Sequence, residues 1–422
     1  MRLLSVIGIV TLYVTVNTNG LPAPASTVKT WLSNDKRDQS QQFVSNLARN
    51  FSSFYFDRMT EYVGKNRIVS SLSAFIPMSL LSYGARGETR KNFLDVIRLP
   101  KHKARMAENG YKIMLQSLAK YDIRLETKML VPTGVRLNPE FIDLSTKVFN
   151  TEIEYADTTD VTDKQKNPTE LIEPQPTGRA LSFSLNNTIR FKGIWKKAFD
   201  KFFTTLRPFH AFGDDDPVMV PTMYTTGRFK HGRIDEISAS FVELPYESNS
   251  EDDAMSMFIL LPDEVEGDDW VYMISNLRNI TLSRLLNSTE KEVAVTLPKF
   301  NIETELSLNE FLNRISSFSG PSNFSGIFDA DAQFDLGESV TKIVIEVDEE
   351  GEEAAASSGI SYYDSTVLAT LDSKTRSAAR EVTEFNVDRP FAALIITKGN
   401  IFMDIFCINY PGSEYPPYGM II

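Results

Sequence analysis

Few residues of this chain combine the type and the spacing that metal binding or nucleophilic catalysis needs. The only histidines are widely separated: His102, His210 and His231. None of them lies in an HExxH pattern or another zinc-ligand spacing. The single cysteine, Cys407, lies in the apolar run 405–408, which favours a buried inert thiol over a catalytic one, and no Gly-x-Ser-x-Gly motif is present. We therefore expect no metal site, no cofactor and no catalytic residues, and we predict that the protein is not an enzyme.

Two segments look like ligand-binding motifs but lack a defining residue. Residues 84–89 read Gly-Ala-Arg-Gly-Glu-Thr, without the Gly-Lys-Ser/Thr ending that contacts phosphate and magnesium. This segment is better interpreted as the end of one helix and the start of another. Asp329, Asp331 and Asp335 resemble a series of calcium ligands, but no glycine or closing glutamate follows at the required spacing. We interpret them as a solvated acidic loop.

A third segment, 347–358, combines dense charge with small side chains, reading Val-Asp-Glu-Glu-Gly-Glu-Glu-Ala-Ala-Ala-Ser-Ser. It follows the β-branched run 343–347, so a strand is expected to end here. Glycine accepts backbone angles that other residues avoid, and small side chains can enter a packed sheet at little steric cost. From composition alone two interpretations stay open: an acidic surface turn followed by a disordered linker, or the hinge of a mobile loop.

The elements around these motifs follow from the periodicity of apolar residues. The chain has 422 residues, 42% hydrophobic and 24% charged, which is typical of a globular protein with a large core. Helical spacing predicts helices over 41–59, 73–82 and 108–119, with Pro77 near a first turn or at a kink. β-rich runs predict strands over 125–131, 181–191, 241–246, 255–261, 293–300, 342–347, 391–396 and 401–408. Helices first and strands later predict an α+β fold with mostly antiparallel sheets.

Residues 1–20 have the layout of a secretory signal peptide: Arg2, an apolar run over 3–16 and a polar end. That run is too short to span a membrane, and no later segment is long and apolar enough. The net charge of -12 argues against nucleic-acid and membrane partners. We therefore predict a secreted, extracellular monomer. Asn-x-Ser/Thr triplets predict glycosylation at Asn50, Asn279, Asn287 and Asn323.

Three segments, in order along the chain, read Asn-x-x-x-Ser-Ser-Leu-Ser at 66–73, Gly-Ala-Arg-Gly-Glu-Thr at 84–89 and Asn-x-x-x-Phe-Lys-Gly-x-Trp at 187–195. Together they resemble the serpin family of serine protease inhibitors. Residues 66–73 and 84–89 resemble its N-x-x-x-S-P-L-S and G-A-R-G-x-T motifs, and 187–195 resembles N-x-x-x-F-K-G-x-W. Further matches follow at 220–229, 244–246, 257–262, 297–300 and 388–391. The resemblance covers about residues 40–411 and implies a single serpin domain with three mostly antiparallel β-sheets and about eight helices. It also implies an exposed reactive-centre loop at about 349–385, with tails at 21–39 and 412–422.

The resemblance implies a role for the segment 347–358. A protease attacks the loop and forms an acyl-enzyme, and the cleaved arm then inserts into the main sheet and carries the protease with it. The partner would be an extracellular serine protease. The implied hinge is Glu349, Glu350, Gly351, Glu352, Glu353, Ala354, Ala355 and Ala356. The residues implied to control opening of the sheet are Lys299, Trp195, Ser70, Ser73, Asn187 and Thr341. Because Asn186 lies beside this cluster, we expect its Asn-x-Ser/Thr triplet to stay unused.

The reactive bond can be placed in two ways. At the family's usual spacing from Gly351 it lies between Ser365 and Thr366, which suits a protease with a small or permissive primary pocket. Three basic residues further along would suit a trypsin-like protease: Lys374, Arg376 and Arg380. Cleavage at Arg376 would add roughly 36 Å of slack to the inserted arm, at ~3.3 Å per residue. Slack would leave the protease unstrained, so we prefer Ser365.

Four departures from the family pattern keep an alternative open: a non-inhibitory serpin that acts as a binding, storage or carrier protein or as a protease substrate. Glu352 stands where the family usually has Thr or Ser, and burying a lone carboxylate there on insertion is costly. Thr341 replaces a common histidine. The stretch 157–180 contains prolines where the family has a long helix, which we expect to be shortened or missing. The loop is also longer than usual, which the fold can tolerate.

Overall fold

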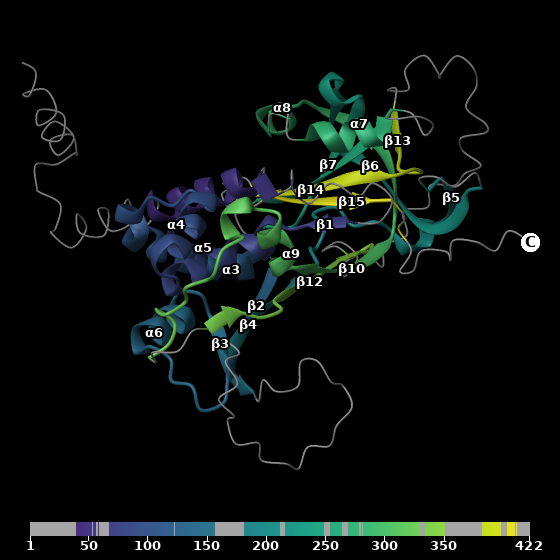
Figure 1. The fold of residues 1–422 in the computed structure, drawn as a ribbon. Helices are drawn as coiled ribbons and strands as arrows, with labels where there is room; N and C mark the ends of the chain where they lie inside the picture. Colours follow the sequence, from purple (N-terminus) through teal and green to yellow (C-terminus); the bar gives the residue numbers. More distant parts are fainter. Residues whose placement is uncertain are drawn as a thin grey trace, which may run out of the picture.

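A computed structural model describes residues 39–52, 54, 55, 58, 67–121, 123–156, 181–211, 216–248, 254–263, 269–277, 280, 282–329, 334–350, 382–397, 403–409 and 411. Most helices gather at one end of the molecule, and two β-sheets make up the rest (Figure 1). Two more helices lie beside the larger of these sheets. Residues 39–52 form the first helical segment. It is followed along the chain by α3 (Ser71–Gly84), α4 (Gly87–Val96), α5 (Ala104–Leu118), α6 (Pro139–Lys147), α7 (Asp269–Asn276), α8 (Leu282–Leu286) and α9 (Leu308–Asn313).

The central helix is α3, which is apolar on all sides and buried from residue 72 to residue 82. It contacts strands of both sheets, so it lies between them. Pro77 lies in its interior rather than near its first turn. Helix α6 begins as its sequence predicts, because Asn138 accepts a hydrogen bond from the Glu140 amide at 2.9 Å and Pro139 occupies the first helical position.

The first sheet has six strands, with β10, β12, β4, β2 and β3 side by side in that order and β11 paired to β4. Its strands are β2 (Ile123–Pro132), β3 (Thr151–Ala156), β4 (Leu181–Phe191), β10 (Phe300–Ser307), β11 (Phe334–Leu336) and β12 (Val340–Val347). In β12 partly exposed and buried side chains alternate strictly, as period-2 patterning requires when one face covers a core. Its buried face packs on α3.

The second sheet has nine strands in the order β1, β15, β14, β8, β7, β6, β9 and β13, with β5 paired to β6. Its strands are β1 (Arg67–Val69), β5 (Thr205–Phe209), β6 (Val218–Ile234), β7 (Ala239–Pro245), β8 (Met255–Pro262), β9 (Glu290–Pro298), β13 (Thr383–Asn386), β14 (Phe391–Thr397) and β15 (Met403–Ile408). Strand β8 is buried along its whole length, which explains its uninterrupted apolar sequence.

The α+β class and the mostly antiparallel pairing are confirmed, but the described strands form two sheets rather than the expected three. The cause is β6, a strand of 17 residues. It pairs with β9 over 222–230 and with β7 over 231–234, so it joins two groups of strands into one sheet. Among the described residues, no helix is long and apolar enough to cross a membrane.

Candidate functional site

The centre of the six-stranded sheet is a seam between β4 and β12. The two strands pair in parallel, from Thr341 opposite Asn187 to Ile345 opposite Phe191. Their outer neighbours run the other way, because β2 is antiparallel to β4 and β10 is antiparallel to β12. Strand β12 leads directly into residues 348–350, after which the described chain resumes at Val382. The seam is therefore closed by direct strand pairing next to the start of the predicted loop.

Beneath the seam, four residues predicted from the sequence come together as a buried polar cluster: Ser70, Ser73, Asn187 and Thr341. The Thr341 hydroxyl donates to the Ser73 carbonyl oxygen at 3.1 Å. The Asn187 side-chain amide donates to the same carbonyl and to the Thr341 hydroxyl, both at 3.4 Å. A hydroxyl in place of the family's histidine therefore still connects β12 to β4 and to α3. The Ser73 hydroxyl donates back to the Ser70 carbonyl at 2.5 Å.

Pro77 explains why the Ser73 carbonyl is free to accept these bonds. In a regular helix, the amide of residue 77 would donate to the carbonyl of residue 73, but proline has no N–H. The carbonyl of a buried residue needs another donor. Here the donors come from β4 and β12, so the broken helical bond of α3 becomes the attachment point of the seam.

At the other end of the seam, backbone bonds hold the start of the loop. The Trp195 indole N–H donates to the Asp348 carbonyl at 2.8 Å. The amide of Trp195 donates to the Glu350 carbonyl at 3.0 Å, and the amide of Phe199 donates to the Glu349 carbonyl at 3.2 Å. Three consecutive carbonyls after β12 are thus bound to the segment that follows β4.

Glu349 forms an ion pair with Lys299 in which the carboxylate is largely withdrawn from water: its side chain is 5% exposed and that of Lys299 is 37% exposed. One carboxylate oxygen lies 2.7 Å from the Lys299 ammonium, and the other accepts from the Thr204 hydroxyl at 2.8 Å. Burial alone would raise the pKa of Glu349, but the bonds from Lys299 and Thr204 outweigh it and the pKa is lowered. The carboxylate is therefore held in its charged form.

A second, more exposed cation gathers the remaining acidic side chains near the loop start. The Lys192 ammonium lies 2.9 Å from Glu346, 3.0 Å from Asp348 and 3.2 Å from Glu350. The hydrogen bonds that Lys192 donates to Glu346 and Asp348 raise the pKa of this lysine. Burial would raise the pKa of Asp348, but the Glu350 amide and Lys192 lower it instead. Three carboxylates here thus share one lysine, and this contact was not predicted.

The Trp195 ring packs on Tyr246, which in turn contacts Phe191. Its ring stacks on Tyr246 with centroids 4.4 Å apart and 11° between the planes, and Phe191 packs edge-on against the same tyrosine at 5.3 Å. A Cβ atom at residue 193 would lie 2.5 Å from the Tyr246 ring. The glycine of the Phe-Lys-Gly-x-Trp segment is therefore required by this close approach, which gives that motif a physical reason.

Some predicted site residues fall outside the described part of the chain. These are Gly351, Glu352, Glu353, Ala354, Ala355, Ala356, Ser365, Thr366, Lys374, Arg376, Arg380 and Asn279. The signal peptide and the stretch 157–180 also lie outside it. Of the other glycosylation candidates, Asn50, Asn287 and Asn323 are exposed. Asn186 is partly buried, and its side-chain oxygen accepts from the Val340 amide at 3.0 Å.

Sequence reasoning missed Thr204, Lys192 and Tyr246 as parts of the site. Thr204 gave no signal, because it lies between a short helical turn and β5 and reaches Glu349 only in the fold. Lys192 could have been found, since Glu346, Asp348 and Glu350 alternate and so point to one face of an extended chain. In the described residues, no group of three or more His, Cys, Asp and Glu side chains could hold a metal ion.

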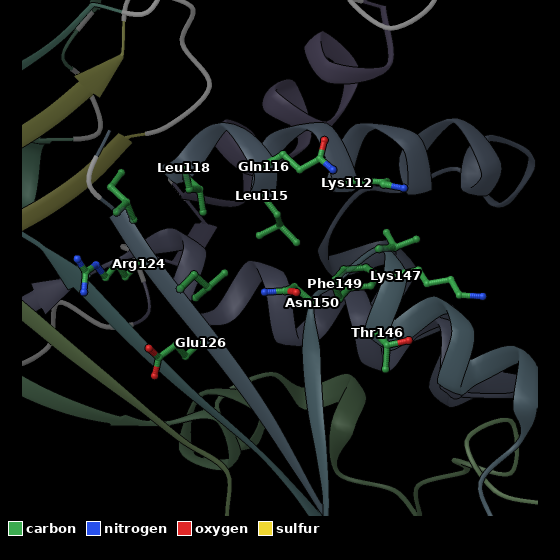
Figure 2. A pocket seen from close by; sticks show the side chains of 13 residues that line it. Lys112, Leu115, Gln116, Leu118, Arg124, Glu126, Thr146, Lys147, Phe149 and Asn150 are labelled. Carbon is green, nitrogen blue, oxygen red and sulfur yellow. The ribbon is translucent and has the colours of Figure 1, made fainter. Parts of the chain in front are cut away.

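A cavity of about 550 Å³ lies apart from the seam, between α5, β2 and the turn that joins α6 to β3 (Figure 2). Apolar side chains line it, including Leu115, Leu118 and Phe149. Polar and charged groups stand around these, and Figure 2 shows Lys112, Arg124, Glu126 and Lys147 among them. Its size is that of a site for a small molecule.

The chain resembles known proteins along most of its length. A family model described as serpin (serine protease inhibitor) matches residues 46–403. Antitrypsin from Bombyx mori is 28% identical over 395 residues, which are 87% of this chain and 95% of that protein. Antichymotrypsin-2 from the same organism is 30% identical over 342 residues, 74% of this chain and 88% of that protein.

The fold agrees with this match. The solved structure of the mouse protein-Z dependent protease inhibitor superimposes with a TM-score of 0.69 at 18% identity, covering 89% of this chain and 99% of that chain. At this identity the likeness concerns the fold alone. The family model, which covers well over half of the chain, supplies the assignment, and the seam, the loop start and the motifs around Trp195 lie within its match. The chain therefore belongs to the serpin family.

Proposed function

We propose that this protein is a secreted serine protease inhibitor that acts as a suicide substrate. Serpins are protease inhibitors and not enzymes, so the catalytic groups belong to the target. The protease cleaves the loop and stays attached as an acyl-enzyme while the freed arm enters the six-stranded sheet. The homologues named antitrypsin and antichymotrypsin-2 support a serine protease as the target class.

The parallel seam is the observation that carries this proposal. A chain that turns back after β12 runs antiparallel to β12 and also to β4, because these two strands are parallel to each other. One inserted strand would therefore replace a parallel pairing by two antiparallel ones. Antiparallel pairing is slightly more stable per residue, and the added strand also makes new hydrogen bonds. The topology thus favours insertion once cleavage frees the arm.

Incubation with trypsin-, chymotrypsin- and elastase-like proteases tests the proposal. We expect an SDS-stable complex on a denaturing gel with at least one of them, and sequencing of the released fragment locates the reactive bond. Cleavage at Ser365–Thr366 would support the arm length that we prefer. Loop cleavage without any complex across the panel would refute inhibition and favour the non-inhibitory alternative.

The cavity in Figure 2 is the observation that favours the carrier form of that alternative. The lining is mixed, with apolar side chains beside polar and charged ones, and it carries three basic residues, Lys112, Arg124 and Lys147, against one acidic residue, Glu126. Such a lining suits a small molecule that has an apolar part and an acidic group. Displacement of a fluorescent fatty acid from the protein would support this second function, provided that Leu115→Trp, which fills the cavity, abolishes the displacement. Equal binding by the filled variant would refute it.

A further inference from the structure

We propose that the ribbon formed by β5 and the first residues of β6 is a second docking surface for the target protease, outside the loop that the protease cleaves. Four large hydrophobic side chains define this surface, which we call the apolar ribbon patch: Phe202, Phe203, Leu206 and Met219. The inference rests on the proposed encounter with a serine protease, but it does not require that the encounter end in trapping.

The patch is unusually exposed for its composition. Phe202 is 84% exposed, Leu206 63%, Met219 54% and Phe203 46%. A single exposed apolar side chain is ordinary, but neighbouring ones mark an interaction site. In the ribbon, Leu206 lies opposite Pro221, and Pro208 lies opposite Met219. Leu206, Pro208, Met219 and Pro221 therefore point to one face of the ribbon, and all four are exposed. Phe202 and Phe203 lie in the turn before β5, where their ring centroids are 5.4 Å apart and Phe203 also contacts Tyr224.

Nothing in the described part of the chain covers this face. Strand β5 pairs only with β6 there, so it forms an edge of the nine-stranded sheet, and it lies away from the helical end of the molecule (Figure 1). Proteins usually protect such an edge strand with charged side chains or proline. Pro208 removes one edge amide, yet the apolar side chains beside it remain open to a partner.

The position of the patch identifies the partner as the body of the protease. Thr204, between Phe203 and β5, holds Glu349 at 2.8 Å. Lys299 also holds Glu349, at 2.7 Å, while its amide binds the Pro221 carbonyl at 2.8 Å. The patch thus adjoins the start of the loop. A protease whose cleft receives the loop brings its outer surface over this end of the sheet.

The charges around the patch define what that surface must look like. The segment 196–208 carries four basic residues and one acidic residue, although the chain as a whole has a net charge of -12. Lys201 and Arg207 flank the aromatic and aliphatic side chains and are exposed. An apolar protease surface bordered by carboxylates would match both features, and rim charges of this kind raise association rates.

The test compares wild type with the double variant Leu206→Ser/Met219→Ser and with Tyr272→Ser. Tyr272 is 47% exposed on α7, so it is a control of similar exposure outside the ribbon. With a protease that cleaves the loop, we measure the second-order rate of cleavage or complex formation, and the affinity for the same protease with its nucleophilic serine replaced by alanine. Removing two central apolar contacts should lower both by about tenfold or more. A free peptide spanning 352–381 should be cleaved equally well in the presence of any variant.

The outcomes separate this inference from the proposed function. Slower loop cleavage by the double variant, without an SDS-stable complex for any form, would support the docking surface and refute inhibition. Complex formation at equal rates by wild type and double variant would refute the docking surface and leave inhibition intact. Unchanged protease rates together with loss of a concentration-dependent dimer would also refute it, because the patch would then bind a second copy of this chain.

Discussion

Replacing Thr341 by valine should weaken the pairing of β4 and β12 at the seam, because it removes one buried hydroxyl. Valine keeps the shape of threonine, but it cannot donate to the Ser73 carbonyl at 3.1 Å or accept from Asn187 at 3.4 Å. A buried neutral hydrogen bond contributes about 1 kcal/mol, and a carbonyl left without a good donor costs about 1–3 kcal/mol more. The remaining Asn187 bond to this carbonyl is long, at 3.4 Å. We therefore expect Thr341→Val to destabilise the closed seam by about 2–3 kcal/mol.

Pro77→Ala provides the test of this reasoning. Alanine supplies the amide that proline lacks, so α3 itself can donate to the Ser73 carbonyl. In that background Thr341→Val should cost only about 1 kcal/mol, the value of the single lost bond. The difference of about 1–2 kcal/mol is the coupling energy of a double-mutant cycle. This coupling requires only that the Ser73 carbonyl has a helical donor in the Pro77→Ala background and lacks one in wild type.

The assay is the rate of unfolding in urea, followed by tryptophan fluorescence, because the native state of a serpin is maintained kinetically. If the seam is broken in the transition state, Thr341→Val should unfold about 30- to 150-fold faster in wild type but only about fivefold faster in the Pro77→Ala background. Thr188→Val is the matched control on the outer face of β4 and should stay within about twofold. Equal acceleration in both backgrounds would refute the role of the freed carbonyl.

Three further perturbations address the loop start. Glu349→Gln should lower the activation free energy of unfolding by about 1–2 kcal/mol, because it removes the ion pair with Lys299. The loss is limited because Lys299 keeps some contact with water, and an unchanged unfolding rate would contradict the pairing. The lowered pKa values of Glu349 and Asp348 stabilise the fold above the ordinary carboxyl pKa of about 4. That stability should fade as pH falls through the folded values, and Glu349→Gln should flatten the profile. Glu352→Thr should raise the fraction of protease captured per cleaved inhibitor on a denaturing gel; an unchanged fraction would show that Glu352 does not limit insertion.

The sequence predicted most strands that have a buried face. The interval 181–191 coincides with β4, and 255–261 agrees with β8 to within a residue. It missed β10, because the run Phe-Asn-Ile-Glu-Thr-Glu-Leu-Ser carries acidic side chains on its exposed face. Periodicity also missed β6, which contains Pro221 and Gly227 and pairs with three different strands in turn, although the family resemblance matched 220–229 within it. These strands depend on partners far away in the chain, which local propensity does not reveal.

The site residues likewise fall into those that the sequence could predict and those that it could not. Resemblance to family motifs led to Trp195, Asn187 and Lys299, and these do meet at the two ends of one seam. Thr204 could not be predicted, because its role depends on β5 folding back against the start of the loop. From the sequence, Pro77 predicts only a first turn or a kink in a helix. Its function as the source of a free carbonyl needs the position of β12, which lies some 260 residues further along the chain.

The side-chain contacts at the two ends of the seam differ in charge and length. Next to the loop, charged or well-aligned bonds to Glu349 and Asp348 have lengths of 2.7–2.8 Å. At the far end the bonds among Ser73, Asn187 and Thr341 are neutral and 3.1–3.4 Å long. In the proposed insertion, the arm would therefore part the charged contacts of Glu349 and Asp348 first and the neutral contacts of Thr341 and Asn187 afterwards. In the proposed mechanism, we expect the contacts at the entrance to oppose insertion first and the buried cluster around Thr341 to be the second barrier that a cleaved arm meets.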